Sequence, residues 1–224
     1  MIKTKLETFI KKYSLGNTLD VVRWICKDKV LTVNEITADK KLLVTTNMKN
    51  FDSFRDIELI VRDTPSLKSK LSVLGEEFTI NLINGDDDPN RIIAMEFEDE
   101  RTTLFINTGA EGDKDGKKPK LMNIPEFSVE IVLTDQFKTD FNKAKSSFSD
   151  INLFTLIMSK KKQKLDMVLG HSNTAITDKV NLSVYPVEGK NTINTPINFS
   201  ADGVKQILNV NSEAKAPVLK VSEP

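Results

Sequence analysis

The sequence has few of the residues that build reactive or cross-linked sites. Among its 224 residues it holds one cysteine, Cys26, and one histidine, His171. A lone cysteine cannot form an internal disulfide, so we expect a reducing compartment. Zinc sites of the cysteine and histidine type are excluded by number alone. A catalytic triad or dyad would depend on His171, which stands between two strand-like segments and is predicted to be a turn residue.

Neither sign of charge is in excess, and long apolar segments are lacking. Lysine and arginine together number 32, as do aspartate and glutamate, and the isoelectric point is about 6.6. This balance excludes a protein coated with positive charge throughout, and a strongly acidic tail. No apolar run reaches the roughly 18 residues of a membrane-spanning helix. Residues 1–14 interleave lysines with single apolar residues, unlike a signal peptide. We therefore expect a soluble intracellular protein that contacts no membrane.

Two acidic loops, residues 84–89 and 112–118, are candidate cation or phosphate sites. Neither has the ligand spacing of an EF-hand, and the second lacks the serine or threonine of a phosphate-binding loop. Both are predicted to be solvated turns. We therefore predict no metal, no cofactor, no catalytic residue and no enzymatic activity. An enzyme that uses a pair of carboxylates stays open as an alternative, because 32 acidic residues can always include such a pair.

Two long helices with the same apolar spacing are predicted, 135 residues apart. The first carries Ile2, Leu6, Phe9 and Tyr13, and the second carries Phe137, Phe141, Ala144 and Phe148. Steps of four, three and four residues place these side chains on one face of a helix. The chain therefore reads as two related halves.

A pair of shorter helices supports this reading. One is predicted to begin with Thr64 as its cap and Pro65 at its first position, and to end at Gly75. Its counterpart begins at Ser200, and at an offset of 137 residues Leu67 falls on Val204 and Leu71 on Leu208. The two pairs occur in the same order, so a duplication is the simplest explanation.

Strands are predicted between and after these helices. The predicted ranges are 21–27, 30–36, 42–47, 57–61, 78–83, 91–97, 102–107, 127–133, 151–158, 164–169, 179–185, 195–199 and 217–221. Residues 108–124 are rich in glycine, lysine, aspartate and proline and are predicted to be a linker. We predict an α+β fold of two similar β-rich domains, each with two helices packed on antiparallel sheet. The expected bounds are 1–110 and 125–224, joined by a connector of residues 111–124.

This order of elements resembles that of DNA sliding clamps, and most of all the T4-type bacteriophage clamp. The resemblance covers essentially the whole chain, including the connector and the segment Pro125–Ile131 that opens the second half. It implies a homotrimeric ring around duplex DNA, with sheets outside and helices lining the hole. It also implies a processivity role in the cytoplasm of an infected bacterium. The implied partners are duplex DNA, the replicative DNA polymerase, an ATP-dependent clamp loader and factors of late transcription.

The sequence departs from the T4-type pattern at both ends. About fourteen residues follow Val210, where the family has several strands, and the first helix begins almost at Met1. The sequence therefore does not identify the strands that would close the ring.

The charge distribution tests the resemblance. The four helix windows, residues 1–14, 65–74, 135–148 and 200–211, hold ten lysines and four acidic residues, a net charge of +6. The rest of the chain holds 22 basic and 28 acidic residues, a net charge of −6. The residues predicted to face DNA are Lys3, Lys11, Lys12, Lys68, Lys138, Lys143 and Lys205. On a helical wheel, Lys11 and Lys143 point most directly away from the apolar faces.

A pocket for the peptide tails of partner proteins is implied near the connector. The apolar residues available for it are Leu121, Met122, Ile124, Pro125, Pro217, Val218 and Leu219. An apolar cluster with a polar rim is the expected form of such a site. The alternative is that Ile124 and Pro125 only anchor the linker on the core. For the whole protein, the alternative to a clamp is a two-domain β-rich viral adaptor or structural protein that does not encircle DNA.

Overall fold

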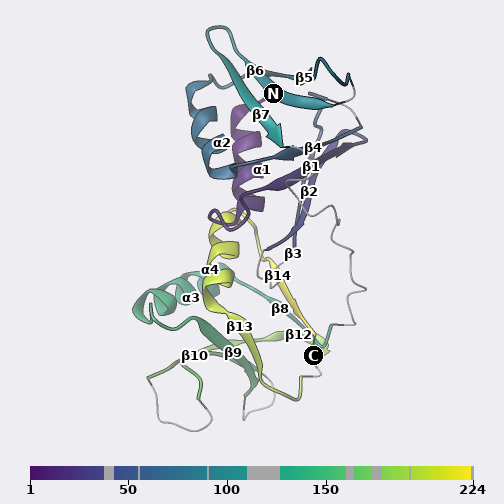
Figure 1. The fold of residues 1–224 in the computed structure, drawn as a ribbon. Coiled ribbons are helices and arrows are strands. Elements are labelled where there is room, and N and C mark those ends of the chain that lie inside the picture. The colour runs from purple at the N-terminus through teal and green to yellow at the C-terminus, as the bar shows by residue number, and fades with distance from the viewer. Residues whose placement is uncertain are drawn as a thin grey trace. The chain divides into compact units, whose positions relative to one another are not determined.

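The computed structural model describes residues 1–37, 43–54, 56–89, 91–109, 127–159, 164–172, 178–191 and 193–222 (Figure 1). The chain divides into two compact units, Met1–Leu121 (unit 1) and Met122–Pro224 (unit 2). The expected connector lies outside the described residues, so the domain bounds stay a prediction.

Unit 1 combines a helix pair with one antiparallel sheet. Its elements are α1 (Lys3–Ser14), β1 (Val22–Lys27), β2 (Val30–Ile36), β3 (Leu43–Lys49), β4 (Ile57–Val61), α2 (Thr64–Lys70), the 3-10 turn η1 (Leu71–Val73), β5 (Thr79–Asn84), β6 (Ile92–Glu98) and β7 (Thr103–Gly109). The strand order is β3-β2-β1-β4-β7-β6-β5. Before α1, Ile2 forms an isolated antiparallel bridge with Glu77, just before β5.

Unit 2 also has two helices, but its antiparallel strands form two sheets. Its elements are β8 (Val129–Val132), α3 (Asp135–Ser147), β9 (Leu153–Met158), β10 (Leu165–Leu169), β11 (Val180–Val184), β12 (Pro186–Asn191), β13 (Ile197–Ser200), α4 (Ala201–Val210) and β14 (Val218–Val221). The strand orders are β11-β10-β9-β13 and β12-β8-β14. Its core brings together residues of both helices and both sheets, including the fully buried Phe141 and Phe154.

The two units share a topology. In unit 1 the strand after α1 lies between β2 and β4, and in unit 2 the strand after α3 lies between β10 and β13. The first helix of each unit contacts the edge strand of this four-strand arrangement, β3 or β11, and also contacts the second helix of its unit. The repeat expected from periodicity is therefore present as a repeated chain path, and the α+β class is confirmed (Figure 1).

The helices begin and end where local chemistry allows. The side chains of Thr134 and Ser200 accept hydrogen bonds from Phe137 N and Gly203 N and so cap α3 and α4. The cap predicted for α2 is wrong by one residue. Asp63 caps this helix by accepting from Ser66 N, whereas the Thr64 hydroxyl donates to the carbonyl of Asp20.

Every predicted strand is present, with ends shifted by two residues at most. The prediction missed β12, which begins at Pro186 and pairs irregularly with β8 through a register shift. No helix in the described ranges has the length and hydropathy to cross a membrane.

Candidate nucleic-acid interface

Each unit presents the outer faces of two helices that contact each other (Figure 1). The inner face of α1 is fully buried at Leu6, Ile10 and Tyr13. The ring of Phe9 meets Trp24 of β1 edge-on, with centroids 5.9 Å apart. The apolar stripe therefore packs on the sheet, and the polar side chains of the helix remain at the surface.

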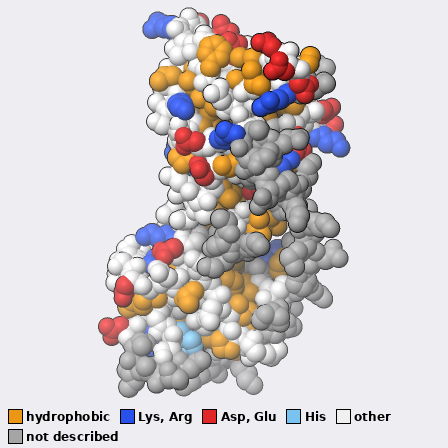
Figure 2. All heavy atoms as spheres, in the orientation of Figure 1, with side chains coloured by type: hydrophobic (Ala, Val, Ile, Leu, Met, Phe, Trp, Pro, Cys, Tyr) orange, Lys and Arg blue, Asp and Glu red, His pale blue; other side chains and the backbone are white. Residues whose placement is uncertain are grey.

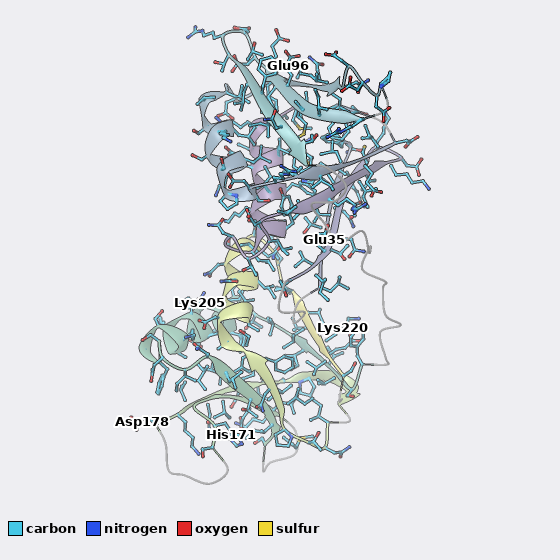
Figure 3. The ribbon with its side chains drawn as sticks, in the orientation of Figure 1. Glu35, Glu96, His171, Asp178, Lys205 and Lys220 are labelled. Carbon is cyan, nitrogen blue, oxygen red and sulfur yellow. The ribbon has the colours of Figure 1, made fainter. Side chains whose placement is uncertain are left out.

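The structure separates the seven lysines predicted to face DNA by exposure. Lys11, Lys68 and Lys143 are exposed, whereas Lys3, Lys12, Lys138 and Lys205 are half-buried. Figure 3 shows Lys205 on α4. On the face seen in Figure 2, basic and acidic side chains are interspersed on both units. Contact with DNA stays a prediction for all seven.

Two of these lysines join the first helix of a unit to the end of its second helix. The Lys3 ammonium donates to the carbonyls of Leu74 (2.6 Å) and Ser72 (3.2 Å), just after α2. The Lys138 ammonium donates to the carbonyl of Ala214 (2.9 Å), just after α4, and pairs with Asp135 (2.6 Å). A cation near a helix C-terminus satisfies carbonyls that lack a partner within the helix. Lys3 therefore stabilises the fold of unit 1, and Lys138 stabilises the fold of unit 2, in addition to any role toward DNA.

Sequence reasoning missed a third structural lysine. The side chain of Lys145 is 4% exposed, donates to the carbonyl of Ser149 (2.8 Å) and pairs with Asp202 of α4 (3.1 Å). Its flank position beside the apolar stripe of α3 signals partial burial, but the partner on another helix is not visible in a helical wheel. Lys145 therefore adds little positive charge to the outer surface.

The cysteine is buried in the core of unit 1, and the histidine lies in a loop of unit 2. Cys26 is 2% exposed, and its thiol donates to the carbonyl of Phe54. Burial raises the pKa of this thiol, and the carboxylates of Asp56 and Asp52 raise it further, which disfavours a nucleophilic thiolate. His171 lies in the loop after β10 (Figure 3), beside Gly170. Among the described residues, no group of three or more histidine, cysteine, aspartate or glutamate side chains is placed to hold a metal ion.

The residues predicted to receive partner tails are only partly described. Leu121, Met122, Ile124 and Pro125 lie outside the described residues. Pro217 and Leu219 are half-buried, and Leu219 packs against the core of unit 2. Val218 is 47% exposed.

Val218 belongs to an exposed apolar pair on the outer face of the β12-β8-β14 sheet. It lies opposite Val132 of β8, which is 39% exposed. Beside this pair, Lys220 pairs with Glu130 (3.3 Å) and its ammonium lies 5.5 Å from the ring centroid of Phe127. Sequence reasoning missed Val132, although its alternation with Val129 and Ile131 signals an outward side chain.

Solved structures match this chain path over its whole length. The crystal structure of proliferating cellular nuclear antigen (PCNA) from Entamoeba histolytica covers 99% of this chain and 86% of its own, with 13% identity and a TM-score of 0.68. This chain has the fold of a sliding clamp. The crystal structure of a PCNA2–PCNA3 complex from Sulfolobus tokodaii covers 98% of this chain and 87% of its own chain, with 11% identity and a TM-score of 0.65.

No protein-family model matches this sequence, and no curated protein matches it. At 11 to 13% identity, the structural matches establish the fold alone. These two matched clamps are eukaryotic and archaeal, so the expected closeness to the T4-type clamp stays a prediction.

Proposed function

We propose that this protein is a sliding clamp that encircles duplex DNA as a homotrimeric ring and tethers the replicative polymerase of a bacteriophage. The observation that carries the proposal is the match of both units, over 99% of the chain, to a PCNA structure. The protein acts as a scaffold and carries out no chemical step itself.

The distribution of charge supports the proposal. The protein is neutral overall, yet the four helix windows hold ten lysines against four acidic residues. DNA carries one negative charge per roughly 1.7 Å of duplex, so modest positive helix faces attract it. Lysines that contact phosphates carry no sequence information, and a ring that slides must avoid discrimination between bases. Closure of the ring then replaces tight binding as the means of staying on DNA.

The sheet edges offer a route to the ring. In unit 2, β11 and β13 are the edges of the four-stranded sheet, and in unit 1, β3 and β5 are the edges of the seven-stranded sheet. An edge strand presents unpaired backbone groups that a second copy can pair with. A head-to-tail contact that closes after three copies gives a cyclic trimer. The PCNA2–PCNA3 structure is a complex of two such chains, which favours assembly.

The partners follow from the same proposal. The peptide tails of the polymerase, the clamp loader and late-transcription factors bind residues of the connector, Leu121, Met122, Ile124 and Pro125, together with Pro217 and Val218. The exposed pair Val132 and Val218 supports an apolar anchor site on unit 2. The protein works in the cytoplasm of the infected host.

Native mass and a topological assay test the proposal. A trimer has three times the 25.2 kDa mass of the chain. Duplex DNA is attached to a surface at one end, and its free end is blocked by a bound protein either before or after the clamp is added. A ring added before blocking threads onto the DNA and survives a high-salt wash, whereas a ring added after blocking does not.

Cleavage of the DNA near the block should then release the retained protein. A strict monomer at micromolar concentration, together with retention that does not depend on the order of addition, would contradict the clamp. That result would favour the viral adaptor or structural protein that does not encircle DNA.

A further inference from the structure

The repeat allows the two helix pairs to be compared position by position. At an offset of 135 residues, the buried positions Leu6 and Ile10 of α1 coincide with the buried positions Phe141 and Lys145 of α3. The bridging lysines Lys3 and Lys138 coincide at the same offset. At an offset of 137, the buried residues Thr64 and Leu71 coincide with Ala201 and Leu208.

The two helix pairs differ strongly in charge. The windows of α1 and α2, residues 1–14 and 65–74, hold six lysines and one acidic residue, a net charge of +5. The windows of α3 and α4, residues 135–148 and 200–211, hold four lysines and three acidic residues, a net charge of +1. Most of the positive charge of the helices therefore belongs to unit 1.

The difference arises at surface positions. Lys5, Lys11 and Lys12 of α1 correspond to Asp140, Ser146 and Ser147 of α3, and Lys70 of α2 corresponds to Ile207 of α4. Lys5, Lys11 and Lys70 are exposed, as is Lys68. Ile207 is also 39% exposed. Unit 2 has thus replaced lysines at the surface by serine, aspartate and an aliphatic side chain, while keeping the buried positions.

The lysines that unit 2 retains are largely engaged in its own fold. Lys145 is buried against Asp202, and Lys138 is held by Asp135 and the carbonyl of Ala214. In the described part of α3 and α4, Lys143 is the one exposed lysine. Near it, the Asp140 carboxylate accepts from the Gln136 amide at 2.9 and 3.0 Å, so a negative charge remains on the same surface.

We propose that the helix pair of unit 1, α1 with α2, is the phosphate-binding surface for duplex DNA, and that the pair α3 with α4 is a nearly neutral spacer. The proposal rests on the clamp function and goes beyond it by assigning the polyanion to one of two equivalent surfaces. A polyanion is attracted by net positive potential, which +5 provides and +1 largely lacks. Each subunit then offers DNA one attractive helix pair and one that allows unhindered movement.

Two double variants with matched charge loss test this assignment. Lys11→Gln with Lys68→Gln removes two charges from unit 1, and Lys143→Gln with Lys205→Gln removes two from unit 2. Each variant changes one lysine on each helix of a pair, and glutamine keeps a high helix propensity. The measurement is the affinity for a linear duplex, by fluorescence anisotropy, at several salt concentrations.

For the unit 1 variant, the slope of the logarithm of the binding constant against the logarithm of the salt concentration should become shallower by about 1 or more. Its binding at low salt should weaken roughly tenfold. The unit 2 variant should bind within about twofold of the unaltered protein, because it removes little attraction. Equal losses in the two variants, or a larger loss in unit 2, would overturn the assignment. Far-ultraviolet circular dichroism checks that both variants fold.

The clamp function is judged separately, by the order-of-addition assay on the unaltered protein. If that protein encircles DNA but the two variants are equal, this inference fails and the clamp function stands. If the unaltered protein shows no topological retention, the clamp function itself fails.

Discussion

At the scale of single residues, lysines on the same helix have different tasks. Lys138 reaches across to the carbonyl of Ala214 at 2.9 Å, with a side chain 11% exposed, whereas Lys143 on the same helix is exposed. A hydrogen bond from a charged donor contributes more to stability than an exposed charge does. The same substitution is therefore expected to lower the unfolding free energy at Lys138 and to leave it almost unchanged at Lys143.

The Lys138→Met variant should lose about 1 to 2 kcal/mol of unfolding free energy, because the carbonyl of Ala214 loses its charged donor. The Lys143→Met variant is the control and should change stability by less than about 0.5 kcal/mol. Urea unfolding followed by circular dichroism measures both. Equal losses in the two variants would remove the structural role assigned to Lys138.

Tyr13 predicts how stability depends on alkaline pH. Its ring is fully buried, and its hydroxyl oxygen accepts from Trp24 Nε1 at 3.3 Å. Burial raises the pKa of this phenol far above its ordinary value, while hydrogen bonds with Thr64 and Trp24 oppose the rise. The unfolded chain therefore releases this proton first, at about pH 10. The contribution of Tyr13 to stability is constant below that pH and is lost as the pH rises above it, by up to roughly 1.4 kcal/mol per pH unit.

Urea midpoints between pH 9 and 11 test this expectation. The Tyr13→Phe variant should be less stable at neutral pH, since Trp24 loses its acceptor, and should show a shallower alkaline decline. Tyr185→Phe is the control, because Tyr185 is 70% exposed. A decline of the same steepness in the Tyr13→Phe variant would contradict this role for the phenol.

At the scale of elements, much of the fold could be predicted because helices and strands have distinct periods. The apolar spacing of α1 and α3 and the alternation of the strands indicated every element except β12 and η1. The segment of β12 begins with Pro186 and includes Gly189, which lowers its strand propensity, and only its pairing with β8 makes it a strand. A pattern along one segment does not report pairing with another.

The candidate site was less predictable for a related reason. A helical wheel indicates the direction in which Lys3, Lys138 and Lys145 leave their helices. It does not indicate that carbonyls of another segment, or the carboxylate of Asp202, lie within reach. The exposure of Lys11 and Lys143 could be predicted from the helical wheel alone, and both are exposed in the structure.

The backbone just after β10 depends on one glycine. Gly170 has a φ of +79°, and a Cβ added there would lie 2.3 Å from the carbonyl oxygen of Asp178. Gly170→Ala should therefore lower the unfolding free energy by more than about 1 kcal/mol. Gly75→Ala is a suitable control, because its added Cβ meets Asp99 at an ordinary 3.4 Å. Thermal melting compares the two, and equal melting temperatures would contradict the steric argument.

At the scale of the whole molecule, the ring we propose needs both a surface for DNA and a surface for partners. In unit 2 the exposed pair Val132 and Val218 lies on the β12-β8-β14 sheet, whereas the lysines predicted to face DNA lie on helices. The two functions then use different elements of one chain. A partner can bind its tail without competing for phosphate contacts.

Changing Val132 and Val218 to serine should weaken binding of the cognate polymerase tail roughly tenfold, because a short tail depends on a few apolar anchors. Val73→Ser is the control, since Val73 is 59% exposed but lies in unit 1. Calorimetry measures affinity, and an unchanged melting temperature confirms folding. Unchanged affinity in a folded double variant would place the tail elsewhere.

Cys26 has a practical consequence for observing the molecule. It is the one thiol of the chain, 2% exposed and held protonated by its surroundings, so maleimide dyes should react with it slowly. A cysteine placed at an exposed site such as Ser147 would then carry the dye almost alone. In the trimeric ring we propose, fluorescence transfer between such dyes on neighbouring subunits would report opening and closing in real time, with no need to remove a native thiol first.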